Sequence, residues 1–527
     1  MLVESWLMAP VQLDYSNLLL SVVVLAVSCF VIVRSFRSSG RKDGSRVLPP
    51  SPPALPIIGN LHQLGRSHHY RTLLELARRH GPLFLLHLGS VPTRVVSSAS
   101  MAEEVLKAQD HVFCGRPQQH TARGLLYGCR DVAFSAYGER WRQLRRIAVV
   151  HLLSAKRVDS FRVLREEAVA SFVDRVRAAA SAHVDDGGGK RRRGVNVSEL
   201  FISLTYTVIS KAAFGSKLGG MEPGAIRAMM METSQQLETI AVSDVFPCLR
   251  WVDWATGLDA RTKRTARKLD AVLEVALQEH EKSSGRGDDA DDLLDDLLSA
   301  VEQGGAGLNL DRTDVKGLII VSQRDLFLAG TDTTSKTMEW TMAELVKNPK
   351  EMEKVQAELR QIVGEHGRVT EELLSTTTRP QAAIKEALRL HAPVPMLVPR
   401  EAVQDTKLHG YDIPAKTQVL INAWAIGRDE ESWEDADAFR PERFVHTNFD
   451  YSGKDFRFIP FGAGRRGCPG IGFGTRLAEL ALANLLYHFD WELPDDQDLE
   501  SFEVVESSGL SPGLKYPLTL VSKTPQA

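Results

Sequence analysis

The most informative segment of the chain reads Phe461-Gly462-Ala463-Gly464-Arg465-Arg466-Gly467-Cys468-Pro469-Gly470. Its glycines at 462, 464 and 467 match G-x-G-x-x-G, a pattern typical of dinucleotide-binding folds. That pattern requires a strand before it and a helix that opens within it. Here Cys468-Pro469 interrupts the segment before a helix can begin, and no βαβ pattern surrounds it. We therefore reject a dinucleotide site at these residues.

A second pattern, F-x-x-G-x-R-x-C-x-G, accounts for the same segment better. It is matched at Phe461, Gly464, Arg466, Cys468 and Gly470. Through this pattern the chain resembles the cytochrome P-450 superfamily of haem-thiolate monooxygenases. The resemblance implies haem b (iron protoporphyrin IX) as cofactor, with Cys468 as the axial ligand of the haem iron. It also implies the fold of that superfamily, mostly α with small peripheral β-sheets.

The residue types around Cys468 suit a cysteine that binds haem iron as a thiolate. Glycines permit a tight loop whose backbone N–H groups turn toward the sulfur. An apolar helix predicted to begin near Gly470 adds the partial positive charge of its N-terminus. Thiolate ligation pushes electron density onto the iron and favours cleavage of the O–O bond. The alternative interpretation is an inert structural cysteine in a glycine-rich turn.

A polar segment within a predicted helix at 326–347 supports the resemblance. It reads Ala329-Gly330-Thr331-Asp332-Thr333-Thr334 and matches the family's [AG]-G-x-[DE]-T-[ST] segment. Gly330 removes side-chain bulk next to the haem, and a Thr hydroxyl bonded to the carbonyl four residues earlier bends a helix. The resemblance implies that Asp332 and Thr333 are catalytic and deliver protons during oxygen activation. By itself the segment also fits a polar turn of an ordinary helix.

Glu386 and Arg389 are spaced i and i+3, which places them on one face of a helix. The resemblance implies a buried structural network between this pair and Arg443 of a P-x-R-F motif at 441–444. Removing one partner of such a network leaves a buried charge unpaired, at a cost of roughly 3–5 kcal/mol. An exposed helical ion pair is the alternative interpretation of the spacing.

Four more residues complete the implied haem site together with Arg466. Trp141 and Arg145 are spaced i and i+4, and the resemblance implies that they reach the haem propionates. Arg400 and Arg466 match further propionate-contacting positions, and Phe461 is implied to bind the cofactor as well. Arginine suits carboxylates because its planar fork bonds both oxygens. A solvated Trp/Arg face is the alternative for the first pair.

The N-terminal region predicts a membrane anchor. Residues 18–33 (LLLSVVVLAVSCFVIV) carry no charge, and as a helix they would span roughly 24 Å. Acidic residues precede this run and five Lys/Arg residues follow it by residue 46, which favours a retained anchor over a cleaved signal peptide. We expect a short lumenal N-terminus (1–17), a transmembrane signal anchor (18–33), a basic and proline-rich linker (34–56) and a haem-thiolate catalytic domain (57–527). The catalytic domain would face the cytosol at the endoplasmic reticulum membrane.

Composition agrees with one large globular protein. Lys+Arg 64 against Asp+Glu 67 gives a net charge of −3, which does not favour nucleic acid as a partner. Five scattered cysteines argue against a disulfide framework and for a reducing compartment. Periodicity predicts helices at 70–80, 155–182, 262–282, 326–347, 349–363 and 472–488, with short strands at 83–88, 94–97 and 418–422.

These features predict a monooxygenase that inserts one oxygen atom from O2 into a lipophilic small molecule. Electrons would come from NADPH through an NADPH–cytochrome reductase, since the chain has no recognisable flavin or nicotinamide site. The chain looks most like the plant microsomal A-type group, so a specialised metabolite is expected. Two segments, 114–117 and 137–142, resemble grass enzymes of benzoxazinoid synthesis, so the expected substrate is indole-derived (benzoxazinoid-type) or terpenoid. Substrate choice is expected at 113–130, 227–243, 393–398 and 507–513.

Two stretches depart from the family's pattern. Residues 321–324 place Ser-Gln-Arg in a central helix that is one turn longer than usual, and residues 375–380 (STTTRP) replace an apolar approach to the Glu386 helix. They favour an alternative, a catalytically impaired haem-binding paralogue. A haem-thiolate isomerase or dehydratase that needs no reductase is a third hypothesis, which the Asp332-Thr333 pair disfavours.

Overall fold

The computed structural model describes residues 46–65, 68–181, 183–185, 190–192, 194–215, 223–283, 329–364, 367–494, 499 and 502–523. The predicted anchor at 18–33 and the departure at 321–324 lie outside these residues. Among the helices that the structure describes, none combines the length and the apolar character needed to span a bilayer.

Helices make up about half of the described chain. In order they are α2 (His69–His80), α3 (Ala99–Glu103), α4 (His120–Leu125), α5 (Glu139–Ile147), α6 (Ala155–Ser160), α7 (Arg162–Ser181), α8 (Val197–Phe214), α9 (Pro223–Glu238), α10 (Val242–Val245), α11 (Arg250–Ala255), α12 (Leu258–Ser283), α15 (Thr331–Lys347), α16 (Pro349–Val363), α17 (Glu371–Leu374), α18 (Arg379–Leu390), α19 (Ala423–Ile426) and α20 (Ile471–His488). The expected mostly helical fold is confirmed.

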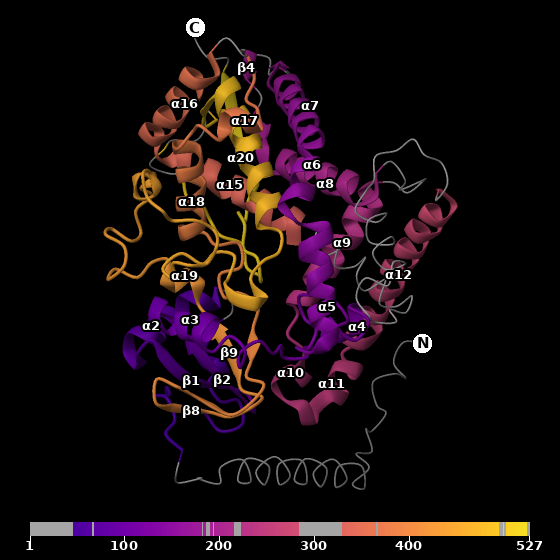
Figure 1. The fold of residues 1–527 in the computed structure, drawn as a ribbon, viewed down its shortest axis with the longest axis vertical. Helices are drawn as coiled ribbons and strands as arrows, with labels where there is room; N and C mark the ends of the chain where they lie inside the picture. Colours follow the sequence, from indigo (N-terminus) through magenta and orange to yellow (C-terminus); the bar gives the residue numbers. More distant parts are fainter. Residues whose placement is uncertain are drawn as a thin grey trace, which may run out of the picture.

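The strands form small sheets. The largest has the order β1 (Leu83–Leu88), β2 (Val91–Val96), β9 (Gln418–Ile421), β6 (Arg400–Glu401), and a second joins β10 (Asp490–Glu492), β11 (Thr519–Lys523) and β5 (Val195–Asn196). Two hairpins, β3–β4 (His183–Asp185, Lys190–Arg192) and β7–β8 (Thr406–Leu408, Tyr411–Ile413), complete the described sheets. β1 and β2 are antiparallel, whereas β2 and β9 are parallel. In Figure 1 the largest sheet lies at one end with α2, α3 and α19, and α15, α18 and α20 lie in the helical part.

Local sequence explains several helix ends. α16 begins at Pro349, whose ring sets φ for a first turn and has no N–H to leave unpaired. It ends before Gly364, which has φ +47° and closes the helix. The helix predicted at 155–182 is divided at Phe161, whose buried ring packs 6.1 Å from that of Phe473 on α20. One predicted helix is therefore two, and a core contact lies at the break.

α15 lies at the centre of the helical part. It packs against α8, α18 and α20, and its residues from Met338 to Val346 are buried. A Cβ added at Gly474 of α20 would lie 3.1 Å from Thr334 Oγ1, so this glycine permits the close approach of α20 to α15. Thr333 therefore lies in the first turn of α15, and Cys468 lies just before α20, the helix that packs against α15.

Candidate haem-thiolate site

Cys468 lies in a short loop between a 3-10 turn (Gly464–Arg466) and the N-terminus of α20. Gly464 has φ +70°, and a Cβ added there would lie 2.2 Å from the carbonyl oxygen of Leu106, so the position requires glycine. The backbone N–H of Cys468 donates to the carbonyl oxygen of Phe461 at 3.0 Å and closes the loop. Cys468 is exposed. The loop thus presents a thiol at the positive end of an 18-residue helix.

Two predicted arginines bond directly to the backbone of this loop. Arg145 of α5 donates through Nη2 to the carbonyl oxygen of Gly467 at 2.5 Å. Arg400 of β6 donates through Nη2 to the carbonyl oxygen of Ala463 at 2.8 Å. Both guanidinium groups therefore contact the cysteine loop, and their predicted contact with haem propionates stays a prediction.

The other two residues predicted to contact propionates, Trp141 and Arg466, are stacked on each other. The guanidinium carbon of Arg466 lies 4.0 Å from the ring centre of Trp141. Arg466 is buried and also donates to the carbonyl oxygens of Cys114 and Ser135, at 2.9 and 2.7 Å. Contact of these two side chains with haem propionates stays a prediction.

Arg116 belongs to the same group of cations, and the sequence analysis missed it. It is buried, and its Nη1 donates at 2.7 Å to the carbonyl oxygens of both Val398 and Pro399. Its Nε donates to the carbonyl oxygen of Ala133 at 2.9 Å. The sequence signal was a charged residue before a proline in Cys114-Gly115-Arg116-Pro117, which shows nothing of these distant partners.

The charges around the loop are unbalanced. Burial lowers the pKa of Arg116 well below its usual value, and the neighbouring Arg400 and Arg466 lower it further. Burial also lowers the pKa of Arg466 to about 10. The carboxylates that act on these three guanidinium groups are Asp110 and Asp131. Together with Arg145, these three arginines place four cations around the loop of the exposed Cys468 thiol. Such a site suits a ligand whose metal binds the sulfur and whose carboxylates bind the arginines, and haem is a ligand of this kind.

The polar segment at the start of α15 has the predicted local geometry. Thr333 Oγ1 donates to the carbonyl oxygen of Ala329, and residues 329 and 330 are π-helical and lead directly into α15. A Cβ added at Gly330 would lie 2.9 Å from Ile209 Cδ1 of α8. Gly330 therefore lies against Ile209 of α8, and its expected role of making room for the cofactor stays a prediction.

Asp332 is engaged in an ion pair. Its Oδ2 lies 2.7 Å from Nζ of Lys336, one turn further along α15. Asp332 and Thr333 thus share a helical turn, with the carboxylate held by a lysine and the hydroxyl held by a backbone carbonyl. Lys336 was not among the residues predicted from the sequence, although its i, i+4 spacing from Asp332 indicates such an ion pair.

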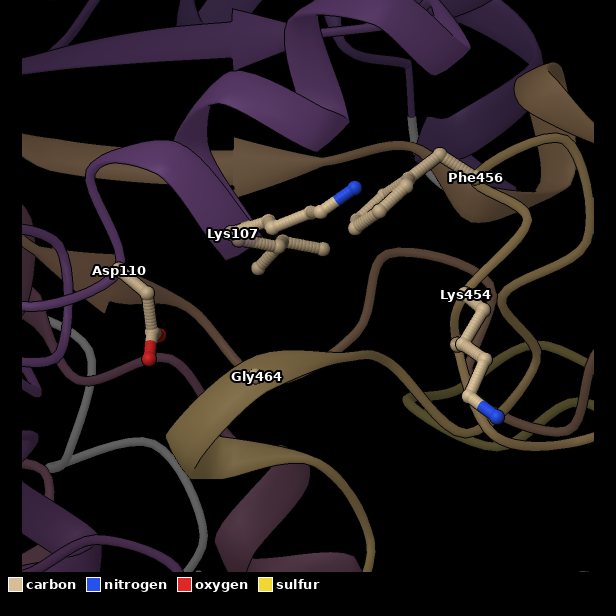
Figure 2. Close-up of a pocket in the computed structure, with 7 residues that line it drawn as sticks. Lys107, Asp110, Lys454, Phe456 and Gly464 are labelled. Atoms are coloured by element: carbon tan, nitrogen blue, oxygen red, sulfur yellow. The ribbon is translucent and has the colours of Figure 1, made fainter.

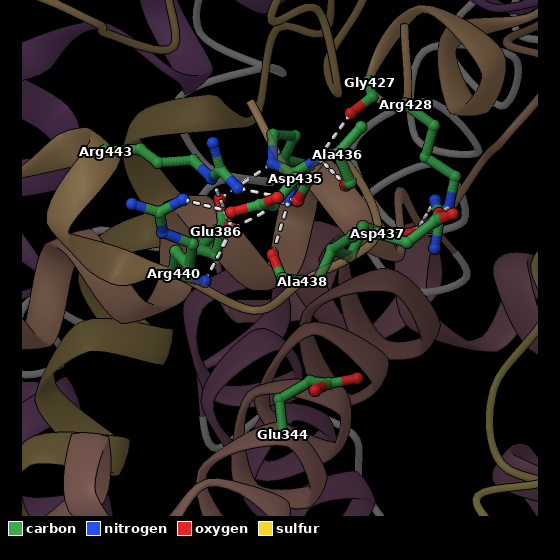
Figure 3. Close-up of polar contacts among 12 residues, drawn as sticks. Glu344, Glu386, Gly427, Arg428, Asp435, Ala436, Asp437, Ala438, Arg440 and Arg443 are labelled. Atoms are coloured by element: carbon green, nitrogen blue, oxygen red, sulfur yellow. Dashed lines mark hydrogen bonds and ion pairs between the residues drawn. The ribbon is translucent and has the colours of Figure 1, made fainter. Parts of the chain in front are cut away.

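Glu386 joins both predicted arginines in a buried network (Figure 3). Arg389 donates to the two carboxylate oxygens through Nε and Nη2, each at 2.8 Å, and neither side chain is exposed. Arg443 Nε and the backbone N–H of Arg440 donate to Oε1 at 3.2 and 2.8 Å. Arg389 also donates to three carbonyl oxygens of the segment after α19, those of Gly427, Ala436 and Ala438. The network joins α18 to the chain that leads to the cysteine loop.

The departure at 375–380 forms a hydrogen-bonded turn. The hydroxyls of Ser375, Thr376 and Thr377 each donate to the carbonyl oxygen three residues earlier, at 2.7, 2.7 and 2.9 Å. Glu358 of α16 accepts from the backbone N–H of Arg379 at 2.8 Å and so satisfies the first turn of α18. These polar residues are therefore accommodated without unpaired hydroxyl groups in the turn.

A cavity of about 350 Å³ lies beside the cysteine loop (Figure 2). Its lining residues are Leu106, Lys107, Asp110, Gly453, Lys454, Phe456 and Gly464. Lys107 Nζ lies 5.8 Å from the ring centre of Phe456. Gly464, at the start of the cysteine loop, is one of these lining residues. None of the predicted site residues lines the cavity.

Comparisons with known proteins agree over most of the chain. The cytochrome P450 family model matches residues 49–517. Cytochrome P450 71A1 of Persea americana is 47% identical over 471 residues, 88% of this chain and 91% of that protein. A 3-beta-hydroxylase of Tanacetum parthenium is 43% identical over 511 residues, 96% of this chain and 98% of that protein. A solved zebrafish cytochrome P450 with progesterone superposes with a TM-score of 0.71 at 27% identity, covering 88% of this chain and 100% of the other.

Proposed function

Because this chain belongs to the cytochrome P450 family, we propose that it is an NADPH- and reductase-dependent monooxygenase that inserts one oxygen atom of O2 into a lipophilic plant specialised metabolite. The observation that carries the proposal is the exposed Cys468 thiol at the N-terminus of α20, with Arg145 bonded to the preceding residue. Haem, the cofactor of the family, supplies the iron chemistry that activates oxygen.

The chain's own residues divide the work around that cofactor. Cys468 binds the metal as a thiolate, which the N-terminus of α20 stabilises. The arginines at 116, 145, 400 and 466 bind carboxylates and supply the positive charge that balances them. Thr333 holds a proton on a hydroxyl that Ala329 fixes, and Asp332 exchanges protons as general acid and base.

The substrate is proposed to be an indole-derived or terpenoid metabolite that contacts 113–130, 227–243, 393–398 and 507–513. A relative named for 3-beta-hydroxylation and a zebrafish structure that holds progesterone support a lipophilic substrate. Spectral titration of the haem protein with terpenes and with indoles tests this class. Saturable binding by neither class would contradict it.

The reductase is proposed to bind beside the cysteine loop. Lys107, Lys454 and Arg465 are exposed around the cavity there. A cluster of exposed cations favours encounter with an acidic protein face, and the encounter rate then falls with added salt. Gly464, which begins the turn before Cys468, lines this cavity, so a partner bound here would lie beside the cysteine loop.

We place the chain at the endoplasmic reticulum membrane with the catalytic body in the cytosol. The proposal rests on the apolar run at 18–33 and the Lys/Arg residues after it. Exposed apolar side chains support it, because Val47 and Leu48 of the linker and Trp251 and Trp254 of α11 are each about half or more exposed. The start of the described chain and α11 lie at the same end of Figure 1. Tryptophan favours the membrane interface.

The decisive experiment is the reduced, carbon-monoxide-bound difference spectrum of the full-length chain. We expect the red-shifted band of thiolate-ligated haem in the wild type and its loss in Cys468→Ala. Cys248→Ala is the matched control, because Cys248 is also exposed but lies between α10 and α11. Absence of the band in the wild type would favour the impaired paralogue. A normal band in Cys468→Ala would refute Cys468 as the ligand.

Turnover separates the monooxygenase from its two rivals. With reductase and NADPH, only a monooxygenase consumes NADPH and yields an oxygenated product in response to substrate. The hydrogen-bonded turn at 375–380 removes one reason for the impaired paralogue. A thiolate band without any NADPH-dependent product would favour the impaired paralogue. Product formation without reductase would favour an isomerase.

A further inference from the structure

The loop at 507–514 is bound to α15 by contacts that the proposed reaction does not use. The backbone N–H of Leu514 donates to Glu339 Oε2 at 3.2 Å. Trp340 Nε1 donates to the carbonyl oxygen of Pro512 at 3.3 Å. The acceptor Glu339 and the donor Trp340 lie on α15 about two helical turns after Asp332. The loop, one of the regions expected to contact substrate, is therefore a direct neighbour of the catalytic helix.

Lys336 is the point at which this loop meets Asp332. Its Nζ lies 2.7 Å from Asp332 Oδ2 and also donates to the carbonyl oxygen of Ser511. A Cβ added at Gly513 would lie 3.0 Å from Lys336 Cε, so the loop packs on the stem of the side chain as well. The Lys336 side chain is 20% exposed. One ammonium group thus joins the predicted proton donor to the substrate loop.

The surroundings of Lys336 are acidic. Glu238, the last residue of α9, hydrogen-bonds to the backbone of Leu510 and Ser511 in the same loop. Burial raises the pKa of both Glu238 and Glu339, and Lys336 opposes that shift in each case. Lys336 is therefore the cation that compensates three carboxylates, those of Asp332, Glu238 and Glu339. Its removal would change the charge around Asp332 as well as its position.

We propose that Lys336 is a positioning residue for Asp332, and that it makes proton delivery depend on the position of the 507–514 loop. The inference rests on the proposed function, because it assumes that Asp332 handles protons in the monooxygenase reaction. A substrate that shifts the loop moves the Ser511 carbonyl, and the shared ammonium then changes its hold on Asp332. Occupancy of the substrate site is in this way coupled to the availability of a proton.

An ordinary solvated ion pair would not do this. Exposed i, i+4 pairs on helices contribute little to stability, and their loss leaves function unchanged. Lys336 differs in two ways. The nitrogen that pairs with Asp332 also donates to Ser511, about 175 positions later in the chain. The same loop packs on the methylene groups of the lysine side chain. The two interpretations predict different results for one set of variants.

The test uses full-length Lys336→Met, Lys336→Arg, Asp332→Asn and the double variant Asp332→Asn/Lys336→Met. Lys347→Met is the matched control, because Lys347 is exposed at the end of the same helix. Two quantities are measured, the ratio of product to NADPH consumed and the hydrogen exchange of the 509–514 amides in the substrate-free enzyme. We expect Lys336→Met to lower the ratio about fivefold and to speed exchange about tenfold, since hydrogen bonds to a charged group are lost.

Non-additivity identifies a residue that acts through another. If Lys336 acts through Asp332, the double variant has the same product ratio as Asp332→Asn alone. Lys336→Arg should retain most of the wild-type ratio, and Lys347→Met all of it. Multiplying effects in the double variant, or a wild-type ratio in Lys336→Met, would overturn the positioning role. Unchanged loop exchange in Lys336→Met would overturn the link to the loop. Absence of the thiolate band in the wild type is a separate failure, that of the proposed function, and loop exchange still decides whether Lys336 holds the loop.

Discussion

Trp141 and Arg466 donate hydrogen bonds to the same carbonyl oxygen, that of Val132, at 2.9 and 3.2 Å. The indole and the guanidinium are also stacked, so a helix near the start of the catalytic body and the loop before Cys468 are joined at one point. The stack buries a cation against an aromatic face, an arrangement that is worth more than the same pair in water.

Trp141→Leu should therefore destabilise the fold by about 3 kcal/mol, because a buried indole and its partner contacts are lost. Trp141→Phe keeps the aromatic face and loses only the N–H donor, so about 1 kcal/mol is expected. Urea unfolding midpoints and haem content per chain measure both effects. Equal losses in the two variants would show that the stack contributes nothing.

The buried network predicts a larger effect at Glu386. Glu386→Gln leaves Arg389 and Arg443 without their shared anion, and breaking such a pair costs about 3–5 kcal/mol. We expect poor haem incorporation and a lower unfolding midpoint. Glu442→Gln is the control, because Glu442 is 45% exposed in its pair with Lys354 and should cost less than about 1 kcal/mol. A Glu386 variant as stable as this control would refute a structural role for the network.

Thr333→Ala should uncouple oxygen activation from product formation. The hydroxyl that Ala329 holds is removed, while the helix keeps its length and its packing. We expect NADPH consumption to continue, hydrogen peroxide to rise and the product ratio to fall about tenfold or more. Thr333→Ser retains the hydroxyl and should behave much as the wild type. Fully coupled turnover in Thr333→Ala would remove this residue from proton delivery.

Local patterns predicted those parts of the structure that depend on local sequence. The strand at 83–88 and the helix at 349–363 have the predicted bounds, because the strand is a short, almost entirely apolar run and the helix lies between Pro349 and Gly364. The loop around Cys468 was predicted from its glycines for the same reason. Glu386 and Arg389 were paired correctly because i, i+3 neighbours share a helix face.

Contacts between distant segments were not predictable in this way. Arg116 is positioned by the carbonyl oxygens of Val398 and Pro399, and Lys336 by that of Ser511. Every residue has a backbone carbonyl, so a single sequence does not indicate which carbonyl oxygen a side chain will contact. Neither arrangement could therefore be predicted. The division of the 155–182 helix at Phe161 is a similar case, since the contact with Phe473 that accompanies it is tertiary.

Glu479 of α20 predicts an unusual dependence of stability on pH. Burial raises the pKa of its carboxyl from 4.5 to about 7, with Lys385 and Arg476 opposing the shift and Glu371 adding to it. The neighbouring Tyr451 is partly buried, and the pKa of its phenol is raised, in part by Glu479. A raised folded-state pKa means that stability is fully present below pH 4.5 and is lost as the pH rises through 7.

Glu479→Gln removes this ionisation and keeps the shape of the side chain. Near pH 4 the variant and the wild type should unfold at similar urea concentrations, because the carboxyl is then largely protonated in both the folded and the unfolded chain. At pH 8 the variant should be more stable by roughly 3 kcal/mol, the free energy that corresponds to the shift. Glu353→Gln, on the exposed side of α16, should show no such divergence. Parallel pH profiles for Glu479→Gln and the wild type would show that the carboxyl ionises as easily in the folded protein as in water.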